Sequence, residues 1–577
     1  MSQSPIQYHL IDTFLILKDE YFLHPFINRT RTMNTPSAPH EGLSTLDFVM
    51  LTLYLAGTFG IALIFSKQKG STEEFFLGGR KMPWFAVGLS IVASLMSTIS
   101  YLSLPGEMIK NGIGMMLGYL AIPFSMAVVL LCWVPFFMKL KLTSAYEYLE
   151  QRFNLAARLI GATLFICMRL GWMGVVVYTS SRALTRMLEN EATLSLLNPA
   201  LLFLPIEAEA SFRLMLLVIL LVGLFATIYT TVGGMRAVIW TDVIQFFVLF
   251  SGALLTLGYI IYSTGTGPFT WFAQAAEVTT THTSPPLFSW DLTVRVTMFG
   301  AVMHSFFWTI CTHGSDQIVL QRYFSVGSTT KARRSYLINV VADISVGLLL
   351  ALCGIALLAF YISNPSFLPE TINPTISAEA DDVFPYFIAH QLPAGVGGLI
   401  LAALFAAAMS SIDSGVNSVS AVVTTDFFTR LSRKEKTTAH QLRLARYLTL
   451  FVGAIATATA IGVAFVAQTT NIMELMAKGF NLFLGPLAGL FFVGMFLPFC
   501  TGKSAIPGVL TALTVSGVWS YWTELFSSPP PTFTLAIAAP CLTCLVVSAV
   551  LGLLLEGPGR KPGSEFCWWS VMRNQKE

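Results

Sequence analysis

A run of polar side chains interrupts one of the most apolar stretches of this 577-residue chain. The stretch 393–427 begins with an alanine-rich half and then carries seven hydroxyl, carboxyl and amide groups: Ser410, Ser411, Asp413, Ser414, Asn417, Ser418 and Ser420. In a helix, residues four positions apart share a face, so Ser410 lies above Ser414. Oxygen atoms are the ligands that hard cations prefer. One such serine is usually a packing residue, but seven polar groups in eleven residues favour a sodium site.

Two other apolar segments also carry polar groups inside them. Residues 83–108 hold five serine and threonine hydroxyls between Ser94 and Ser103, followed by Pro105 and Gly106. These serines could instead bond to their own helix. Residues 236–263 carry Thr241, Asp242 and Gln245 near one end. Asp242 either contributes to a site or caps the helix end by snorkelling.

The segment 295–315 ends in a sequence that predicts an interrupted helix. It loses apolar character near its inner end, where it carries His304, His313, Gly314, Asp316 and Gln317. Broken helices expose backbone carbonyls and half-helix ends, which coordinate ions and substrates in transporters.

The composition shows which kind of element must position these groups. Hydrophobic residues make up 54% of the chain and charged residues only 11%, less than half the fraction that is usual in soluble proteins. This excludes a soluble enzyme or a nucleic-acid-binding protein and predicts an all-α integral membrane protein. A bilayer core needs about 20 apolar residues per helix. Thirteen stretches meet this length: 46–66, 83–108, 114–138, 155–188, 212–232, 236–263, 295–315, 335–361, 393–427, 442–467, 470–499, 504–523 and 532–556.

The distribution of lysine and arginine predicts the orientation of the chain. One set of alternating loops and the C-terminal tail hold most of these residues, whereas the opposite loops hold only Lys110, Arg182, Arg186 and Arg213. Arg322 is counted among the basic residues of the first set. Because basic loops stay in the cytoplasm, we expect an outside N-terminus and a cytoplasmic C-terminus in the plasma (inner) membrane.

The regions outside the spans are short. Residues 1–45 lack a signal peptide, and we expect either a disordered tail or a start assigned too early, with Met33 as the true start. Residues 46–556 form the membrane domain, and 557–577 form a cytoplasmic tail.

Six sequence segments resemble the sodium/solute symporter family. They are EEFFLGGRKMPWF (73–85), LTSAYEYLEQRF (142–153), TTVGGMRAVIWTDVIQ (230–245), SDQIVLQRY (315–323), AAAMSSIDS (406–414) and LGPLAGLFFVGMF (484–496). They occur in order from about 46 to 500, and two of them look closest to the iodide, monocarboxylate and multivitamin branch. The resemblance implies a LeuT-like fold of two inverted five-helix repeats, here about 83–263 and 295–499, with the second and seventh spans broken.

The resemblance also implies sodium sites. One site would use the backbone carbonyls of Ala93, Met96 and Ala407 with the hydroxyls of Ser410 and Ser411. A second site, found in some members, would use Ser410 again with Asp242, Asp413 and Ser414. The matching position in that second pattern is a serine, so Asp413 is a departure that could strengthen the site or hold a proton.

The substrate pocket is expected between the two broken helices. Its candidate residues are Ser97, Ser100, Tyr101, Trp308, His313, Asp316 and Gln317. Ser100 replaces the amide or acid that sugar carriers have, which weakens a sugar substrate. An anionic solute would require a cation, and Arg169 and Lys478 are the basic groups well inside spans. Each could instead pair with an acid or snorkel.

We therefore expect a secondary transporter rather than an enzyme. It would couple inward sodium flow to uptake of a small organic solute or anion, with sodium as coupling ion and no cofactor. Its partners would be the solute, sodium and the lipid bilayer, without nucleic acid. A sodium-coupled sugar transporter and a membrane-embedded solute sensor remain alternatives.

Overall fold

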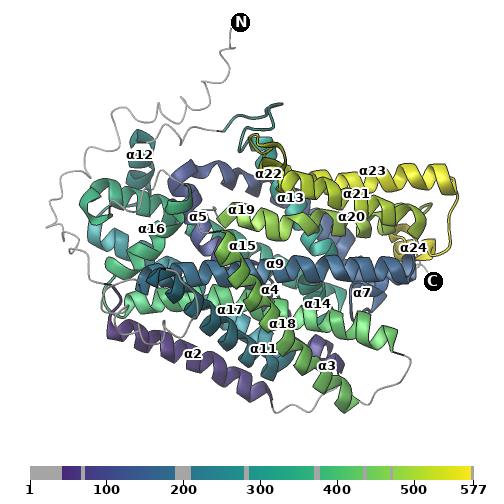
Figure 1. Ribbon diagram of the computed structural model, residues 1–577, viewed down its shortest axis with the longest axis horizontal. Helices are drawn as coiled ribbons and strands as arrows, with labels where there is room; N and C mark the ends of the chain where they lie inside the picture. Colours follow the sequence, from purple (N-terminus) through teal and green to yellow (C-terminus); the bar gives the residue numbers. More distant parts are fainter. Residues whose placement is uncertain are drawn as a thin grey trace, which may run out of the picture.

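The computed structural model describes residues 42–66, 72–188, 209–278, 285–369, 377–432, 438–467 and 472–573. The predictions for residues 1–41, including Met33, lie outside this part. Within it, the protein is an all-helical membrane protein, as predicted, and ten helices are long and apolar enough to cross a membrane. Figure 1 shows the long helices running beside one another along the long axis of the molecule.

The first half of the chain contains the following helices: α2 (Thr45–Ser66), α3 (Thr72–Leu77), α4 (Trp84–Leu95), α5 (Thr98–Asn111), η4 (Gly112–Ala121), α6 (Ile122–Val128), η5 (Val129–Trp133), α7 (Val134–Leu140), α8 (Glu147–Arg152), α9 (Leu155–Leu188), α11 (Ala210–Thr264) and α12 (Pro268–Val278). The bounds of α9 coincide with the predicted stretch 155–188. Gly234 divides α11 at φ 62°, where a side chain would be strained, so two predicted spans meet end to end there.

The second half follows with α13 (Met298–Ser315), α14 (Gln317–Ser325), α15 (Thr329–Ser363), α16 (Ser377–His390), α17 (Val396–Val422), η7 (Val423–Thr429), α18 (Thr438–Val466), α19 (Ile472–Met476), η8 (Ala477–Asn481), α20 (Leu482–Phe496), α21 (Gly502–Ser520), α22 (Trp522–Phe526), α23 (Ala538–Leu551), η10 (Gly552–Glu556) and α24 (Trp568–Arg573). The helix α17 packs against α2, α4, α9 and α11, and its residues from Ala406 to Val422 are all buried. The polar run of α17 therefore lies in the centre of the bundle rather than against lipid.

The two ends of the bundle carry different short helices. In Figure 1, α12 and α16 lie at the left end, α24 lies at the right end beside the C-terminus, and α3 lies at the lower right of centre. The α24 segment is docked rather than free, because Lys139 Nζ of α7 donates to the Val571 carbonyl at 3.1 Å.

Candidate sodium and solute sites

The predicted break in the second span is confirmed. The helix α4 ends at Leu95, and Met96 and Ser97 are extended before α5 begins at Thr98. The Ser97 hydroxyl caps α5 by accepting a hydrogen bond from the Ile99 amide at 3.1 Å. Because carbonyls in the last turn of α4 have no partner further along a helix, the break offers backbone oxygens in the middle of the bundle.

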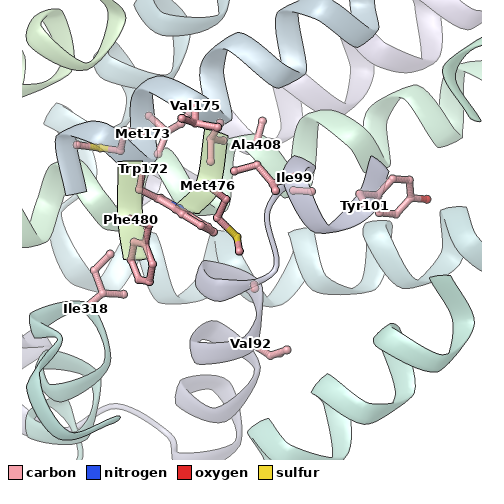
Figure 2. Close-up of a cluster of buried hydrophobic side chains, with 14 of the residues drawn as sticks. Val92, Ile99, Tyr101, Trp172, Met173, Val175, Ile318, Ala408, Met476 and Phe480 are labelled. Atoms are coloured by element: carbon pink, nitrogen blue, oxygen red, sulfur yellow. The ribbon is translucent and has the colours of Figure 1, made fainter. Parts of the chain in front are cut away.

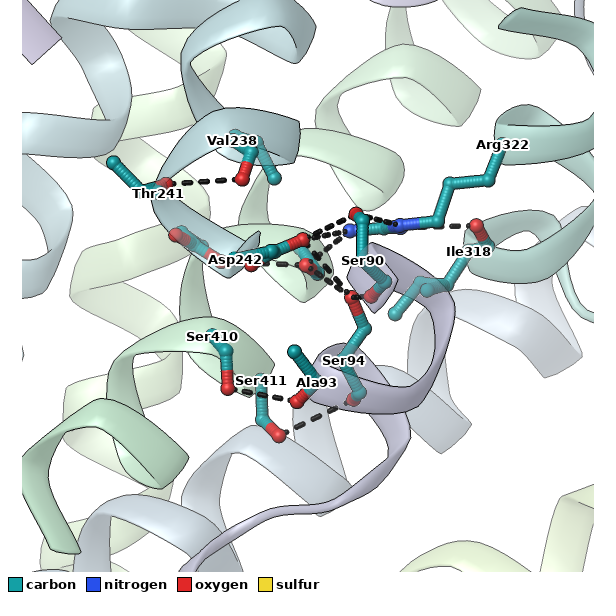
Figure 3. Close-up of polar contacts among 12 residues, drawn as sticks. Ser90, Ala93, Ser94, Val238, Thr241, Asp242, Ile318, Arg322, Ser410 and Ser411 are labelled. Atoms are coloured by element: carbon teal, nitrogen blue, oxygen red, sulfur yellow. Dashed lines mark hydrogen bonds and ion pairs between the residues drawn. The ribbon is translucent and has the colours of Figure 1, made fainter. Parts of the chain in front are cut away.

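Two hydroxyls of α17 lie against this break. Ser410 Oγ donates to the Ala93 carbonyl at 2.7 Å and to the Ala407 carbonyl at 3.2 Å. Ser411 Oγ donates to the Ser94 carbonyl at 3.2 Å. Figure 3 shows both contacts crossing from α17 to the end of α4. The structure thus brings four of the five predicted sodium ligands together and places the fifth, Met96, at the break itself.

The region expected to hold a second sodium contains an arginine. Asp242 Oδ2 accepts hydrogen bonds from Arg322 Nη2 at 2.8 Å and from Ser90 Oγ at 2.5 Å. Arg322 Nη2 also donates to Ser414 Oγ at 2.6 Å, and its Nε donates to Ser90 Oγ at 2.7 Å. Figure 3 shows the guanidinium reaching from α14 toward Asp242 on α11.

Two sequence-based interpretations are therefore corrected. Arg322 was counted with the basic residues of the loops, but α14 continues the broken span and buries this side chain completely. Asp242 is not a snorkelling cap, because it is completely buried and ion-paired. A basic residue two turns beyond a predicted break is the signal that could have suggested Arg322.

Asp413 has different partners from Asp242. Its Oδ2 accepts a hydrogen bond from the Tyr229 hydroxyl, and its Oδ1 accepts one from Ser414 Oγ at 3.3 Å. Asp413 is completely buried, and Tyr229 is almost completely buried. Sequence reasoning missed Tyr229, because a tyrosine within an apolar span gives no signal of its partner. The two carboxylates thus differ in environment. Asp242 is paired with Arg322, whereas Asp413 accepts hydrogen bonds from neutral hydroxyls.

The break in the seventh span is also confirmed, and it presents a second ion pair. Asp316 is extended between α13 and α14, and its Oδ1 accepts a hydrogen bond from the Ile318 amide at 2.9 Å. Its Oδ2 accepts from Arg169 Nη2 of α9, and both side chains are completely buried. Among the described residues, Nε and Nη1 of Arg169 have no hydrogen-bond partner. A buried guanidinium therefore keeps two donor groups available.

Aromatic rings surround this arginine. The guanidinium lies over the Phe480 ring, 4.9 Å from its centroid. Trp172 and Trp308 pack on Phe480 with centroid separations of 4.9 and 5.0 Å. Figure 2 shows Trp172 and Phe480 side by side near the connection between α4 and α5. The predicted pocket residues Trp308 and Asp316 therefore belong to the surroundings of Arg169.

The other predicted pocket residues are placed elsewhere. His313 Nδ1 is 2.6 Å from the Tyr323 hydroxyl, and Gln317 Oε1 accepts from the Ala145 amide at 2.8 Å. Tyr101 stacks on Phe384 of α16 at 5.6 Å, and Figure 2 shows it pointing away from Phe480.

The two serines of the predicted pocket and Lys478 also differ in their surroundings. Ser97 serves as the cap of α5, whereas Ser100 is partly buried. Lys478 is partly exposed and forms an ion pair with Glu524 at 2.5 Å, so it is not a deep cation like Arg169.

Two interrupted helices that meet a hydroxyl-rich helix in a membrane bundle define an ion-coupled transporter. A sequence profile of the sodium:solute symporter family matches residues 75–512, and the chain belongs to this family. It is 30% identical to the sodium/sialic acid symporter NanT of Aliivibrio fischeri over 82% of this chain and 87% of that protein. It is 28% identical to the human sodium/iodide cotransporter over 90% of this chain and 76% of that protein.

A solved structure supports the same assignment. The chain superimposes on a substrate-bound, outward-open Na⁺-coupled sialic acid symporter with a TM-score of 0.75 and 27% identity, covering 90% of this chain and all of the other. The protein is thus a sodium-coupled secondary symporter of small solutes, not an enzyme. The similar identities to sialic acid and iodide carriers do not single out the iodide branch.

Proposed function

We propose that the solute is a small organic anion whose carboxylate binds Arg169. The observation that carries this proposal is the pair of unpartnered donors, Nε and Nη1, on a completely buried guanidinium. Unmade hydrogen bonds of buried groups cost about 1–3 kcal/mol each and more on charged groups. A carboxylate could accept from one of these donors together with the second N–H of Nη2, in the parallel geometry that arginine favours.

The surroundings of Arg169 agree with an organic body on the anion. Trp172, Trp308 and Phe480 offer apolar faces for it, while Asp316 holds the guanidinium in place. Sialic acid is a carboxylate and iodide is an anion, so the solutes named for two relatives share the charge proposed here.

We also propose the finer architecture and the first sodium site. Thirteen spans would include two inverted repeats, about 83–263 and 295–499, and both observed breaks fall in the first span of a repeat. The first sodium would bind where Ser410 and Ser411 now donate to carbonyls of α4, with Met96 and Ala407 adjoining. The protein would lie in the plasma membrane with a cytoplasmic C-terminus.

The test is uptake by proteoliposomes, with and without an inward sodium gradient. The panel would contain monocarboxylates, sialic acid, iodide, neutral sugars and proline. We expect sodium-dependent uptake of a carboxylate, and Arg169→Gln should lower it more than tenfold, because charge-assisted hydrogen bonds are worth about 1.5–3 kcal/mol each. Uptake of a neutral sugar alone, or carboxylate uptake that survives Arg169→Gln, would contradict the anion proposal.

Two further variants separate binding from folding. Lys478→Gln removes the exposed basic residue and should leave uptake unchanged. Arg169→Gln strands the buried carboxylate of Asp316, which by itself destabilises a protein. The double variant Arg169→Gln, Asp316→Asn removes both charges, so it should restore protein abundance without restoring carboxylate uptake.

A further inference from the structure

We propose that an anionic phospholipid binds where α4 and the second part of α11 begin, with its phosphate at Lys81 and Arg236. The site, called here the α4 entry site, is a cavity of about 290 Å³. It is lined by Gly78, Lys81, Met82, Pro83, Arg236 and Trp240. It shares no residue with the sodium and solute sites described above.

The charges around the cavity leave one positive charge for a ligand. Arg236 Nη2 pairs with Glu74 at 2.9 Å, and Arg80 Nε pairs with Glu73 at 2.8 Å. Lys81 is exposed and forms no ion pair with any residue that the structure describes. The ammonium group of Lys81 therefore attracts an anion to the cavity, and the guanidinium of Arg236 lines the same cavity.

The helix α4 begins at this cavity. Pro83 lines the cavity and directly precedes Trp84, the first residue of the helix, and no described side chain caps this end. The first amide groups of a helix have no partner within the helix and favour a negative charge. A phosphate at Lys81 would lie near these amides. The bound lipid would thus contact the start of the helix whose other end carries Ala93.

Next to the basic groups, α11 presents an exposed apolar face. Trp240, Ile244 and Phe247 follow Arg236 by four, eight and eleven residues, so all four share one side of the helix. Ile244 is 41% exposed and Phe247 is 55% exposed. Phe85 of α4 adjoins this face, because its ring centroid lies 6.1 Å from that of Trp240. An apolar strip that runs from a cation along a span fits an acyl chain, which a soluble phosphate ester lacks.

The aromatic rings beside the cavity are typical of the membrane surface. Trp84 and Phe85 are in edge-to-face contact at 6.4 Å, and Phe85 contacts Trp240 in the same way. The guanidinium of Arg334 on α15 lies over the Trp84 ring, 5.9 Å from its centroid. Tryptophan gathers at the level of the lipid headgroups, and basic pockets between spans bind anionic headgroups. Charge, rings and apolar strip therefore favour the same ligand.

The experiment is native mass spectrometry of the full-length protein purified in detergent. The probes are dioleoyl phosphatidylglycerol, dioleoyl phosphatidylcholine and glycerol phosphate. We expect phosphatidylglycerol to bind more than tenfold more tightly than phosphatidylcholine. One basic residue at the membrane surface contributes about fivefold. Lys81→Gln should therefore lower this preference about fivefold, and Lys81→Gln with Arg236→Gln should abolish it.

Two further variants separate the headgroup from the chains and from surface charge in general. Ile244→Gln should weaken both lipids severalfold without changing the preference, because it places a polar group on the apolar strip. Lys503→Gln is the matched control: Lys503 is also exposed, but it lies in the first turn of α21 and does not line the cavity. It should leave both affinities unchanged. If the double variant fails to fold, Lys81→Gln alone provides the test, since it removes an exposed and unpaired side chain.

Equal binding of the two lipids would overturn the proposal, and so would a preference that survives Lys81→Gln. Glycerol phosphate that displaces phosphatidylglycerol, together with no effect of Ile244→Gln, would identify a site for a soluble anion instead. A preference lost equally in Lys503→Gln would show that the overall surface charge, and not the α4 entry site, selects the lipid.

Discussion

Single side chains decide which oxygens can face an ion in this protein. Ser410 and Ser411 now donate their protons to carbonyls of α4. On sodium binding, each hydroxyl can rotate its proton away and present a lone pair, since a hydroxyl both donates and accepts. The same two residues thus hold the broken helix together without the ion and would bind the ion when it arrives.

Ser411→Ala should weaken sodium dependence more than protein abundance. Losing one interaction with a charged group costs about 1.5–3 kcal/mol, and 1.4 kcal/mol is tenfold, so the half-saturating sodium concentration should rise about tenfold. Sodium-dependent uptake, normalised to the amount of protein in the membrane, measures it. Ser345→Ala is the control, because the Ser345 hydroxyl donates to the Val341 carbonyl of its own helix. An equal fall in abundance and uptake would indicate a packing role for Ser411.

At the scale of elements, α16 packs against α5, the second part of the broken helix. Phe384 of α16 stacks on Tyr101 of α5, and Asp382 accepts a hydrogen bond from Arg182 of α9 at 2.9 Å. The neighbouring Asp381 is 3% exposed. Burial raises the pKa of Asp381 to about 8, against the opposing effect of Arg182. Glu107 of α5 and the Ile472 amide also face this carboxyl, and α16 is not one of the candidate spans.

The packing of α16 against α5, called here its seating, should therefore depend on pH. When α16 is packed against α5, the Asp381 carboxyl has a pKa of about 8, whereas an exposed aspartate has a pKa of about 3.8. The packed state of α16 therefore binds the proton more tightly. Seating is therefore favoured as the pH falls below 8, and this contribution is lost as the pH rises through 8. A thiol-reactive probe should label Ala380→Cys, a buried position of α16, roughly threefold or more faster at pH 9 than at pH 6.

The labelling rate needs a reference, because thiol reactivity itself depends on pH. Thr293→Cys, on an exposed loop, provides it, and the ratio of the two rates is the quantity compared. Adding Asp381→Asn should make that ratio independent of pH. The same pH dependence with and without Asp381 would show that another group controls α16.

At the scale of the whole molecule, the two ends differ in their basic residues. The end that carries α12 and α16 in Figure 1 includes residues 264–278 and 285–294, which contain neither lysine nor arginine. Its arginines Arg182 and Arg186 are paired with Asp382. The opposite end carries Lys139 and the docked α24. Because loops rich in lysine and arginine remain in the cytoplasm, this second end should face inward.

The orientation predicts which positions an impermeant reagent can reach. In intact cells, Thr293→Cys should be labelled by a membrane-impermeant maleimide, whereas Arg560→Cys should be labelled only after permeabilisation. Both positions are exposed in the structure, so accessibility depends on the side of the membrane alone. Labelling of Arg560→Cys in intact cells would reverse the orientation.

The sequence by itself predicted the all-helical membrane fold, the two breaks and the family. Hydropathy is a property of a residue and its near neighbours in the chain, so a membrane-spanning helix can be recognised from a local stretch of sequence. The predicted stretch 155–188 has the same bounds as α9. The loss of apolar character near Gly314 likewise marks the break at Asp316. The hydroxyls at Ser410 and Ser411 were recognisable because so many polar groups rarely share one span.

Only the tertiary structure decided which side chains meet. Arg322 and Asp242 are 80 residues apart, and Tyr229 and Asp413 are 184 apart. Whether such groups pair depends on how α11, α14 and α17 are rotated and packed, which no local pattern encodes. For the same reason Gln317 was expected in the solute pocket but binds the Ala145 amide instead. A buried charge must find a partner, but the sequence does not state which partner the packed helices place within reach.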